Sequence, residues 1–306
     1  MSPRRTAWAL IGPGKVGTAL GRALARRGWP LRCIAGGSAA RARAAARKLG
    51  PGVRAHADPA DAARELPLVI LAVPNAALEG VATDLAARAR PWKGRTVLHT
   101  GGAASDAVLE PLRRAGASTG RFHPLYPFAG DPRDAERLVG SWFGVSGGQK
   151  AEGVARRLAR DLGGEVIRVP RDAEAVYHLS AVVASNLLVP LAALAAGLGE
   201  SYGVGPKRAL RALLPLMRNT LDNLETRGLP AALTGPLARG DAAAIEAHLR
   251  LLRRRGDADL EAIYRELSRA AVSLMDDAGG LPAGKTARMR RVLGSRRRKR
   301  PGTPEA

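Results

Sequence analysis

The chain has 306 residues, of which 46% are hydrophobic and 25% are charged, which suits a globular protein of one large domain or two ordinary ones. The single cysteine, Cys33, excludes a disulfide within the chain and favours a reducing compartment. No uninterrupted apolar run reaches the ~18 residues of a membrane helix, and the N-terminal apolar stretch is too short for a signal peptide. We therefore expect a cytoplasmic protein without a membrane segment.

The formal net charge is +22, and nine basic residues are gathered in residues 285–300. Without residues 285–306 the chain still has 40 basic and 26 acidic residues, a net charge of +14. Because the basic run lacks aromatic side chains that could stack on bases, the charge favours acidic small molecules over specific recognition of nucleic acid.

The first half of the chain alternates short apolar runs with Ala- and Arg-rich stretches of helical period. The expected strands are residues 7–11, 31–35, 68–73, 96–99, 119–123, 142–145 and 165–169. Several of these runs are apolar throughout, as in strands covered on both faces. The pattern predicts a doubly wound α/β sheet over residues 1–170, with parallel strands and helices on both faces.

Helical patterns without a strand signal follow Val169. Helices are expected at about residues 172–200, 206–225 and 241–254, and from 257 or 259 to 277, with a kink at Pro190. We expect an all-α domain over residues 171–283, followed by a basic, disordered tail over residues 284–306.

A Gly-x-Gly-x-x-Gly motif lies between the first expected strand and the first expected helix. It consists of Gly12, Pro13, Gly14, Lys15, Val16 and Gly17. In such a motif the first glycine permits a tight turn, the second lets the backbone approach a pyrophosphate, and the third lets the helix pack on the strand. The pyrophosphate would bind the free N–H groups of the helix N-terminus. The alternative is a glycine-rich turn in a domain that binds no ligand.

The residues after the second expected strand favour NADP over NAD. An NAD site places Asp or Glu about 20 residues after the motif, but here no acidic residue precedes Asp58. Ser38 and Arg41 could instead bind a 2′-phosphate, and charge-assisted hydrogen bonds of ~1.5–3 kcal/mol would give a roughly ten- to hundredfold preference. Alternatively, Arg41 is a solvated residue on a helix face.

Further stretches carry a resemblance to a known family. They are Val73-Pro74-Asn75, His99-Thr100-Gly101-Gly102, Phe122-His123-Pro124-Leu125, Tyr177-His178 through Ser185-Asn186, and Leu233-Thr234-Gly235-Pro236 through Arg239-Gly240-Asp241. Over about residues 5–275 the chain resembles the short-subunit dehydrogenase-like oxidoreductases, which join a Rossmann-like domain to a domain of unknown function 2520 within the 6-phosphogluconate dehydrogenase-like superfamily. The resemblance implies a Rossmann-like doubly wound sheet, then an all-α domain for substrate binding and dimerisation, and hence a homodimer. Two departures are a glycine where serine is expected after Thr100, and Tyr126-Pro127 where a Gln-Thr pair is more usual.

Ligands of such sheets bind beyond the carboxyl ends of the strands. Val73, Pro74, Asn75 and Thr100 are therefore expected to flank the cofactor. His123 and His178 are candidates for the general acid or base, with His99 as a third, because the pKa of histidine lies near neutrality. We expect Ser185 and Asn186 to orient the substrate. Ser185 shares a helix face with His178, and Asn186 lies about 100° further around the helix. The alternative for each histidine is a packing or capping residue.

A polar turn between two expected helices contains Thr234 and Arg239, which could hold a substrate carboxylate. The alternative is a tight turn that ends in the helix cap Asp241. The histidines lack the close spacing of metal ligands, so no metal is expected.

Together these features predict an NADP-dependent oxidoreductase that transfers a hydride to or from a small carboxylated oxo, hydroxy or imino acid. The alternative is a sensor or scaffold protein that binds NADP without catalysis, because no lysine lies between Lys150 and Lys207. The related β-hydroxyacid dehydrogenases use a lysine on the corresponding helix.

Overall fold

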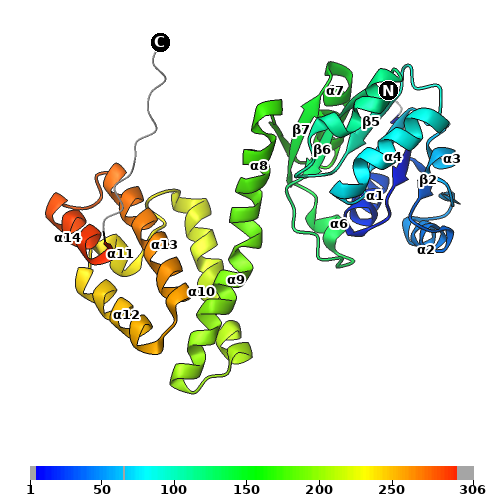
Figure 1. Ribbon diagram of the computed structural model, residues 1–306. Helices are drawn as coiled ribbons and strands as arrows, with labels where there is room; N and C mark the ends of the chain where they lie inside the picture. Colours follow the sequence, from blue (N-terminus) through cyan, green and yellow to red (C-terminus); the bar gives the residue numbers. More distant parts are fainter. Residues whose placement is uncertain (1–4, 65, 295–306) are drawn as a thin grey trace, which may run out of the picture. The chain divides into compact units, whose positions relative to one another are not determined.

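The computed structural model describes residues 5–64 and 66–294. The chain divides into two compact units, one that ends at Leu187 and one that starts at Leu188. Within the described residues, all strands belong to the first unit, and the second is built from helices (Figure 1).

The first unit contains an eight-stranded sheet with the order β3-β2-β1-β4-β5-β6-β7-β8. Its strands are β1 (Trp8–Ile11), β2 (Leu31–Ala35), β3 (Arg54–His56), β4 (Leu68–Leu71), β5 (Thr96–His99), β6 (Ser118–Pro124), β7 (Trp142–Gly147) and β8 (Glu165–Arg168). Neighbouring strands are parallel except β6 and β7, which are antiparallel. The order reverses between β1 and β4, which is where such sheets bind their ligands. The seven predicted strands are confirmed, and β3 was missed because Arg54-Ala55-His56 is not an apolar run.

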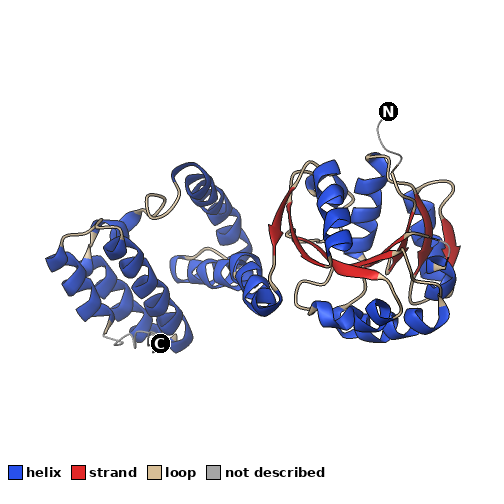
Figure 2. Ribbon diagram, turned by 90° about the horizontal axis from the view of Figure 1, so that it is seen from above, coloured by secondary structure: helices blue, strands red, loops and turns tan. Residues whose placement is uncertain are grey.

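Helices cover both faces of this sheet (Figure 2). They are α1 (Lys15–Arg26), α2 (Ala39–Leu49), α3 (Pro59–Ala63), α4 (Asn75–Arg88), α5 (Glu110–Arg114), α6 (Asp134–Arg137) and α7 (Gln149–Asp161), with α8 (Glu174–Ala181) at the end of the unit. Because side chains alternate along a strand, Trp8 and Leu10 pack with Leu24 of α1, whereas Ile11 packs on the other face with Leu85 of α4. The predicted doubly wound α/β architecture is confirmed.

The segment after α8 forms a π-helical turn over Val182–Asn186. There the N–H of Leu187 donates to the carbonyl of Val182, five residues earlier, at 3.0 Å. A π-turn holds one residue more than an α-helical turn, so Asn186 comes closer than Ser185 to the helix face of His178. The expectation that Ser185 shares that face does not hold through this turn.

The second unit is all-α, as predicted. Its helices are α9 (Leu188–Gly197), α10 (Pro206–Arg227), α11 (Gly235–Arg239), α12 (Ala242–Arg255), α13 (Ala258–Asp277) and α14 (Ala283–Leu293). Asp241 caps α12 by accepting from the N–H of Ala244 at 3.1 Å. Ile245 of α12, Val272 of α13 and Met289 of α14 belong to one buried apolar cluster.

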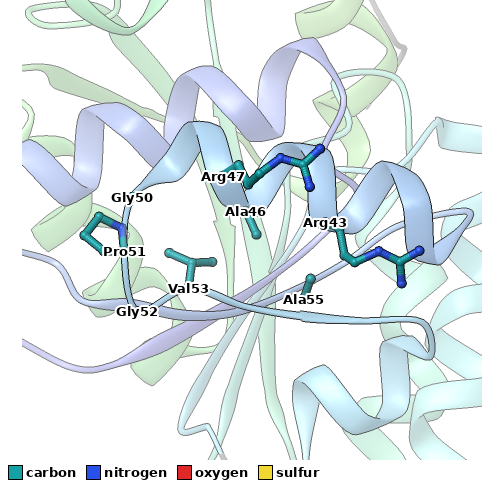
Figure 3. A pocket seen from close by; sticks show the side chains of 8 residues that line it. All are labelled: Arg43, Ala46, Arg47, Gly50, Pro51, Gly52, Val53 and Ala55. Atoms are coloured by element: carbon teal, nitrogen blue, oxygen red, sulfur yellow. The ribbon is translucent and has the colours of Figure 1, made fainter.

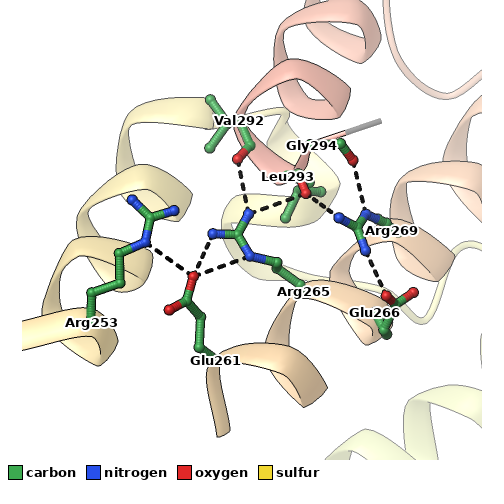
Figure 4. Close-up of polar contacts among 8 residues, drawn as sticks. All are labelled: Arg253, Glu261, Arg265, Glu266, Arg269, Val292, Leu293 and Gly294. Atoms are coloured by element: carbon green, nitrogen blue, oxygen red, sulfur yellow. Dashed lines mark hydrogen bonds and ion pairs between the residues drawn. The ribbon is translucent and has the colours of Figure 1, made fainter. Parts of the chain in front are cut away.

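The expected disordered tail over residues 284–306 is wrong for its first part, because α14 is a helix. Arg265 and Arg269 of α13 donate to the carbonyls of Val292, Leu293 and Gly294, where α14 ends (Figure 4). These guanidinium groups satisfy carbonyls that the helix end leaves without partners, and Met289 and Leu293 are fully buried. Residues 295–306 lie outside the described residues.

Two expectations from the sequence differ from the structure: the position of the domain boundary, and the absence of a segment long enough to cross a membrane. The domain boundary expected after residue 170 precedes α8, whereas the compact units divide after Leu187. One helix among the described residues, Arg171–Tyr202, is long and apolar enough to cross a membrane by length and composition, because an 18-residue window within it has a mean hydropathy of 2.0. The expectation that no segment reaches this length is therefore wrong, because it counted only uninterrupted apolar runs and this segment also contains uncharged Ser180, Ser185 and Asn186. One such helix is weak evidence of a membrane segment.

Candidate active site

The glycine motif forms a bare turn between β1 and α1. Gly12 has φ +100°, and a Cβ there would lie 2.5 Å from the carbonyl oxygen of Ala72, so only glycine fits. A Cβ on Gly17 would lie 2.2 Å from the carbonyl oxygen of Gly12. Because glycine has no side chain, α1 can pack this close to the turn. Gly14, in contrast, is exposed, and a Cβ there would meet nothing within 4 Å. The turn thus presents its backbone to open space at the position where a pyrophosphate would approach.

Gly14 is also the N-cap residue of α1, and the first turn of α1 has no acidic side chain and no side-chain cap. The N–H groups of a first helical turn have no partners within the helix and carry a partial positive charge. Lys15 is exposed at this end. A surface hollow of about 400 Å³ adjoins the turn. Its lining includes Gly14, three basic residues and two acidic ones, namely Lys15, Arg22, Lys48, Asp131 and Asp134. The residues present therefore fit a phosphate-bearing ligand.

The end of β2 lies against the same turn. The N–H of Gly12 donates to the carbonyl of Ala35 at 2.9 Å, and a Cβ on Gly36 would lie 2.8 Å from Cδ of Pro13. Beyond it, Ser38 caps α2 by accepting from the N–H of Arg41 at 3.3 Å, and both side chains are exposed. Asp58, the first acidic residue of the chain, caps α3 by accepting from the N–H of Ala60 at 2.9 Å.

A different basic hollow, of about 630 Å³, lies where α2 leads into β3 (Figure 3). Arg43 and Arg47 project from α2 beside it, and its floor includes Val53 and Ala55. None of the predicted site residues lines this hollow.

The expected cofactor-flanking residues continue from the glycine turn along the carboxyl edge of the sheet. A Cβ on Gly12 would lie 2.8 Å from Cγ1 of Val73, and a Cβ on Gly101 would lie 2.4 Å from Oδ1 of Asn75. Pro74 is the N-cap residue of α4. Thr100 is buried and its N–H donates to the carbonyl of Leu71 at 3.0 Å. The structure thus brings these four residues together beside the motif.

Two of the candidate histidines converge next to these residues. A Cβ on Gly102 would lie 2.7 Å from Nε2 of His123 and 2.7 Å from Nδ1 of His178. His123 lies near the end of β6 and His178 lies in the second turn of α8. Their ring centroids are 6.4 Å apart. Nδ1 of His178 is buried and has no hydrogen-bond partner among the described residues.

Tyr177 contacts the ring nitrogen of His123 that faces away from Gly102. Its hydroxyl lies 2.8 Å from Nδ1 of His123, and a Cβ on Gly144 would lie 2.2 Å from that hydroxyl oxygen, so glycine is required there. Burial lowers the pKa of His123 to about 4, helped by the charges of Arg121, His178 and His99. Burial also raises the pKa of Tyr177 to about 12. Both groups are therefore neutral near pH 7.

His99 lies in a different environment from the other two histidines. Its side chain is fully buried. Its Nδ1 accepts from the N–H of Gly101 at 3.2 Å, and its Nε2 lies 3.1 Å from Oδ1 of Asp106. With both ring nitrogens engaged in this way, His99 can hold the Gly101 turn in place but has no free nitrogen for a ligand.

Asp106 belongs to a buried charged cluster with Arg121 and Glu174. Arg121 is fully buried, and its guanidinium lies 2.9 Å from Glu174 and 3.7 Å from Asp106. Burial acts to raise the pKa of Asp106, but the hydrogen bond to His99 and the charge of Arg121 outweigh it, so this pKa lies below its ordinary value. The cluster joins the segment after β5, β6 and the first turn of α8, and thereby fixes the elements that carry His123 and His178.

The sequence reasoning missed Tyr177, Arg121, Asp106 and Glu174 as parts of the site. Arg121 offered a signal, since a charged residue in an otherwise buried strand requires a partner. Ser185 and Asn186 lie in the π-turn of the first unit, whereas Thr234 and Arg239 are exposed residues of the second unit at the two ends of α11. Their expected contacts with substrate stay predictions, as do the expected roles of His123 and His178, whereas the engaged ring nitrogens of His99 do not suit a general acid or base.

Comparisons with known proteins agree with this architecture. The family model of a Rossmann-like domain matches residues 1–124, and that of a domain of unknown function (DUF2520) matches residues 141–271. The search of curated proteins returned no match.

Solved structures with the same fold include a provisionally named NADP oxidoreductase of Bacteroides fragilis, which is 24% identical, with a TM-score of 0.68 over 88% of this chain and 98% of that one. A 1-pyrroline-5-carboxylate reductase of Streptococcus pyogenes is 19% identical, with a TM-score of 0.60 over 91% of this chain and 100% of that one. An imine reductase of a Pseudomonas species is 18% identical, with a TM-score of 0.61 over 95% of this chain and 100% of that one. By the two family models, the chain is similar to a Rossmann-like domain followed by a domain of unknown function 2520.

Proposed function

We propose that this protein is an NADP-dependent oxidoreductase that acts on a small carboxylated oxo, hydroxy or imino acid. The observation that supports it best is the continuity of one sheet edge, where the bare glycine turn, Asn75 and two converging imidazoles are linked by direct contacts. The fold likeness to structures named as NADP oxidoreductases and imine reductases agrees with this proposal. So does the sequence resemblance to the short-subunit dehydrogenase-like oxidoreductases.

The cofactor would be held by the chain's own backbone and basic side chains. The glycine turn and the first turn of α1 would bind the pyrophosphate, and Ser38 and Arg41 would bind the 2′-phosphate. Val73, Pro74, Asn75 and Thr100 would line the nicotinamide end. When bound, the nicotinamide supplies or accepts a hydride.

The side chains beside Gly102 would act on the substrate. His123 and His178 would hydrogen-bond the oxygen or nitrogen at the reacting carbon and supply the proton that a hydride transfer requires. Asn186 and Ser185 would orient the substrate, and Arg239 with Thr234 would bind its carboxylate.

The decisive experiment is a titration of the purified protein with NADPH and NADH, followed by calorimetry or by quenching of tryptophan fluorescence. NADPH is expected to bind at least about tenfold more tightly, as one charge-assisted contact implies. Tighter binding of NADH, or no binding of either, would contradict the proposal. Tight binding of NADPH without turnover of any hydroxy, oxo or imino acid would instead favour a sensor.

We further propose that a second copy of the chain covers the apolar face of the helix after β8. Val176, Leu179, Val183 and Leu187 recur every three or four residues and are 67%, 58%, 55% and 52% exposed. The same face on a second copy could pair with it about a two-fold axis. Light scattering should then give the mass of a dimer, and Leu179→Glu should give a monomer. A monomeric wild-type protein would refute this arrangement.

A further inference from the structure

The two imidazoles beside Gly102 can hold one atom between them. Nε2 of His123 and Nδ1 of His178 each lie 2.7 Å from the same point, the position of a Cβ on Gly102. The two nitrogens are therefore within twice that distance of each other. One oxygen or nitrogen of a ligand can span this separation with two hydrogen bonds of ordinary length.

The hydrogen bond with Tyr177 determines where His123 carries its proton. Nδ1 of His123 lies 2.8 Å from the Tyr177 hydroxyl and is the acceptor that the described residues offer to it. If Nδ1 itself carried the proton, that hydroxyl would lose this acceptor. A neutral imidazole has a single N–H, and the pKa of about 4 keeps this ring neutral near pH 7. A proton on Nε2, on the side of Gly102, is therefore the arrangement that lets the Tyr177 hydroxyl keep this acceptor.

His178 also faces Gly102, but its ring nitrogen there has no hydrogen-bond partner in the described part of the chain that would orient it. Its Nδ1 is buried without a partner among the described residues. A buried polar nitrogen without a partner is costly in a folded protein, so a ligand group that hydrogen-bonds to it would be favoured.

We propose that the two histidines have different roles: His123, oriented by Tyr177, donates its Nε2–H to the reacting heteroatom and stays neutral, whereas His178 accepts and returns the proton at Nδ1. Tyr177 is then a positioning residue, and Gly102 is required so that both rings can approach. This assignment rests on the proposed function and deepens it.

The proton balance of the reaction follows from these roles. In the oxidative direction the O–H or N–H bond of the substrate breaks, the proton moves to Nδ1 of His178, and the bonding pair forms the second bond to carbon. The oxidised nicotinamide dinucleotide of the proposed function would be the acceptor of the hydride from this carbon. In the reductive direction Nδ1 of His178 returns the proton to the heteroatom.

The arrangement also selects a substrate class. An atom that lies between a donor and an acceptor must accept one hydrogen bond and donate another. A hydroxyl group and a primary or secondary amine meet this condition in the reduced substrate. An ether or a tertiary amine has no proton to donate to His178.

The test is the tautomer of each ring, measured by long-range ¹H–¹⁵N NMR on the full chain without cofactor, with His123→Gln and His178→Gln used for assignment. Near neutral pH we expect His123 and His178 both to carry the proton on Nε2. Tyr177→Phe should return His123 to a mixture of tautomers. A proton on Nδ1 of His123, or of His178, would overturn the assignment.

A second variant tests the convergence at Gly102. Gly102→Ala should shift the ring resonances of His123 and His178 together, because the new methyl would press on both. Gly153→Ala is the matched control, since a Cβ at Gly153 in α7 meets nothing within 4 Å. Unchanged rings in Gly102→Ala would contradict the shared position. Because these spectra need no cofactor, a failure of NADPH to bind the same sample would refute the proposed function separately.

Discussion

Nη2 of Arg121 lies 2.9 Å from Oε1 of Glu174, and both side chains are buried. The same Glu174 oxygen accepts from the N–H of Asp106 at 3.1 Å. One carboxylate in the first turn of α8 is thus bound both to β6 and to the segment that follows β5. These contacts set the position of Tyr177 and His178, which follow in the next turn of the helix.

Glu174→Ala is therefore expected to destabilise the first unit by about 3 kcal/mol, because it leaves the buried guanidinium of Arg121 without its nearest carboxylate. Urea denaturation followed by tryptophan fluorescence measures this loss. Glu136→Ala is the control, since Glu136 pairs with Arg26 at 3.0 Å but both side chains are more than half exposed. The control should cost less than about 1 kcal/mol. Equal losses in the two variants would show that the buried cluster does not anchor α8.

The lowered pKa of His123 predicts a loss of stability in mild acid. The pKa of about 4 in the folded state lies below the ordinary value of 6.5, so between these values the unfolded chain binds a proton that the folded chain does not. Stability contributed by this group is present above pH 6.5 and falls as the pH falls toward 4. His123→Gln should remove about 2 kcal/mol of the difference in unfolding free energy between pH 7 and pH 4.5. If the unfolding free energies of the wild type and this variant changed with pH in the same way, the pKa of about 4 for His123 would be contradicted.

Substitutions at two glycines of the motif should have different effects, one on stability and the other on ligand binding. Gly12→Ala places a Cβ at φ +100° and 2.5 Å from a carbonyl oxygen, so we expect a loss of about 2 kcal/mol or more in unfolding free energy. Gly14→Val meets no neighbouring atom within 4 Å of its Cβ, so we expect a loss of about 1 kcal/mol at most, from the poorer N-cap of α1. It should nevertheless weaken NADPH binding at least about tenfold, because the new side chain occupies the pyrophosphate approach. NADPH affinity unchanged in Gly14→Val would remove the turn from the binding site.

Arg41 should discriminate between the two dinucleotides. Arg41→Glu is expected to weaken NADPH binding by roughly ten- to hundredfold and to leave NADH binding little changed, because only NADPH carries the 2′-phosphate. Arg47→Glu makes the same charge change on α2 about 9 Å further along the helix axis and should affect both cofactors alike and weakly. Calorimetric titration of the wild type and both variants with NADPH and with NADH gives the comparison. Equal weakening of NADPH and NADH by Arg41→Glu would leave Arg41 with a general electrostatic effect only.

The strands and the glycine turn could be predicted because their signals are local. An apolar run such as Leu68-Val69-Ile70-Leu71 must be covered on both faces wherever it lies in the fold. Gly12 and Gly17 are required by contacts within a few residues of the turn and with the neighbouring strand end. Arg121 in a buried strand indicated only that a partner was needed. The local sequence does not identify the partners, because Asp106 and Glu174 are separated by 68 residues. The helix α14 was also missed because its stabilising contacts are not local. Its basic composition suggested disorder, whereas Arg265 and Arg269 of α13 bind the carbonyls at its end.

The sequence by itself determined the order of strands and helices along the chain, the change to helices after β8, and the glycine turn with basic rather than acidic neighbours. It also supplied His123 and His178 as candidates for the general acid or base, with His99 as a third. Only the tertiary structure showed how their surroundings differ, by enclosing His99 between Gly101 and Asp106 while directing His123 and His178 toward Gly102. The physical reason is that the proton chemistry of an imidazole depends on its burial and its hydrogen-bond partners, which come here from strands and helices far apart along the chain.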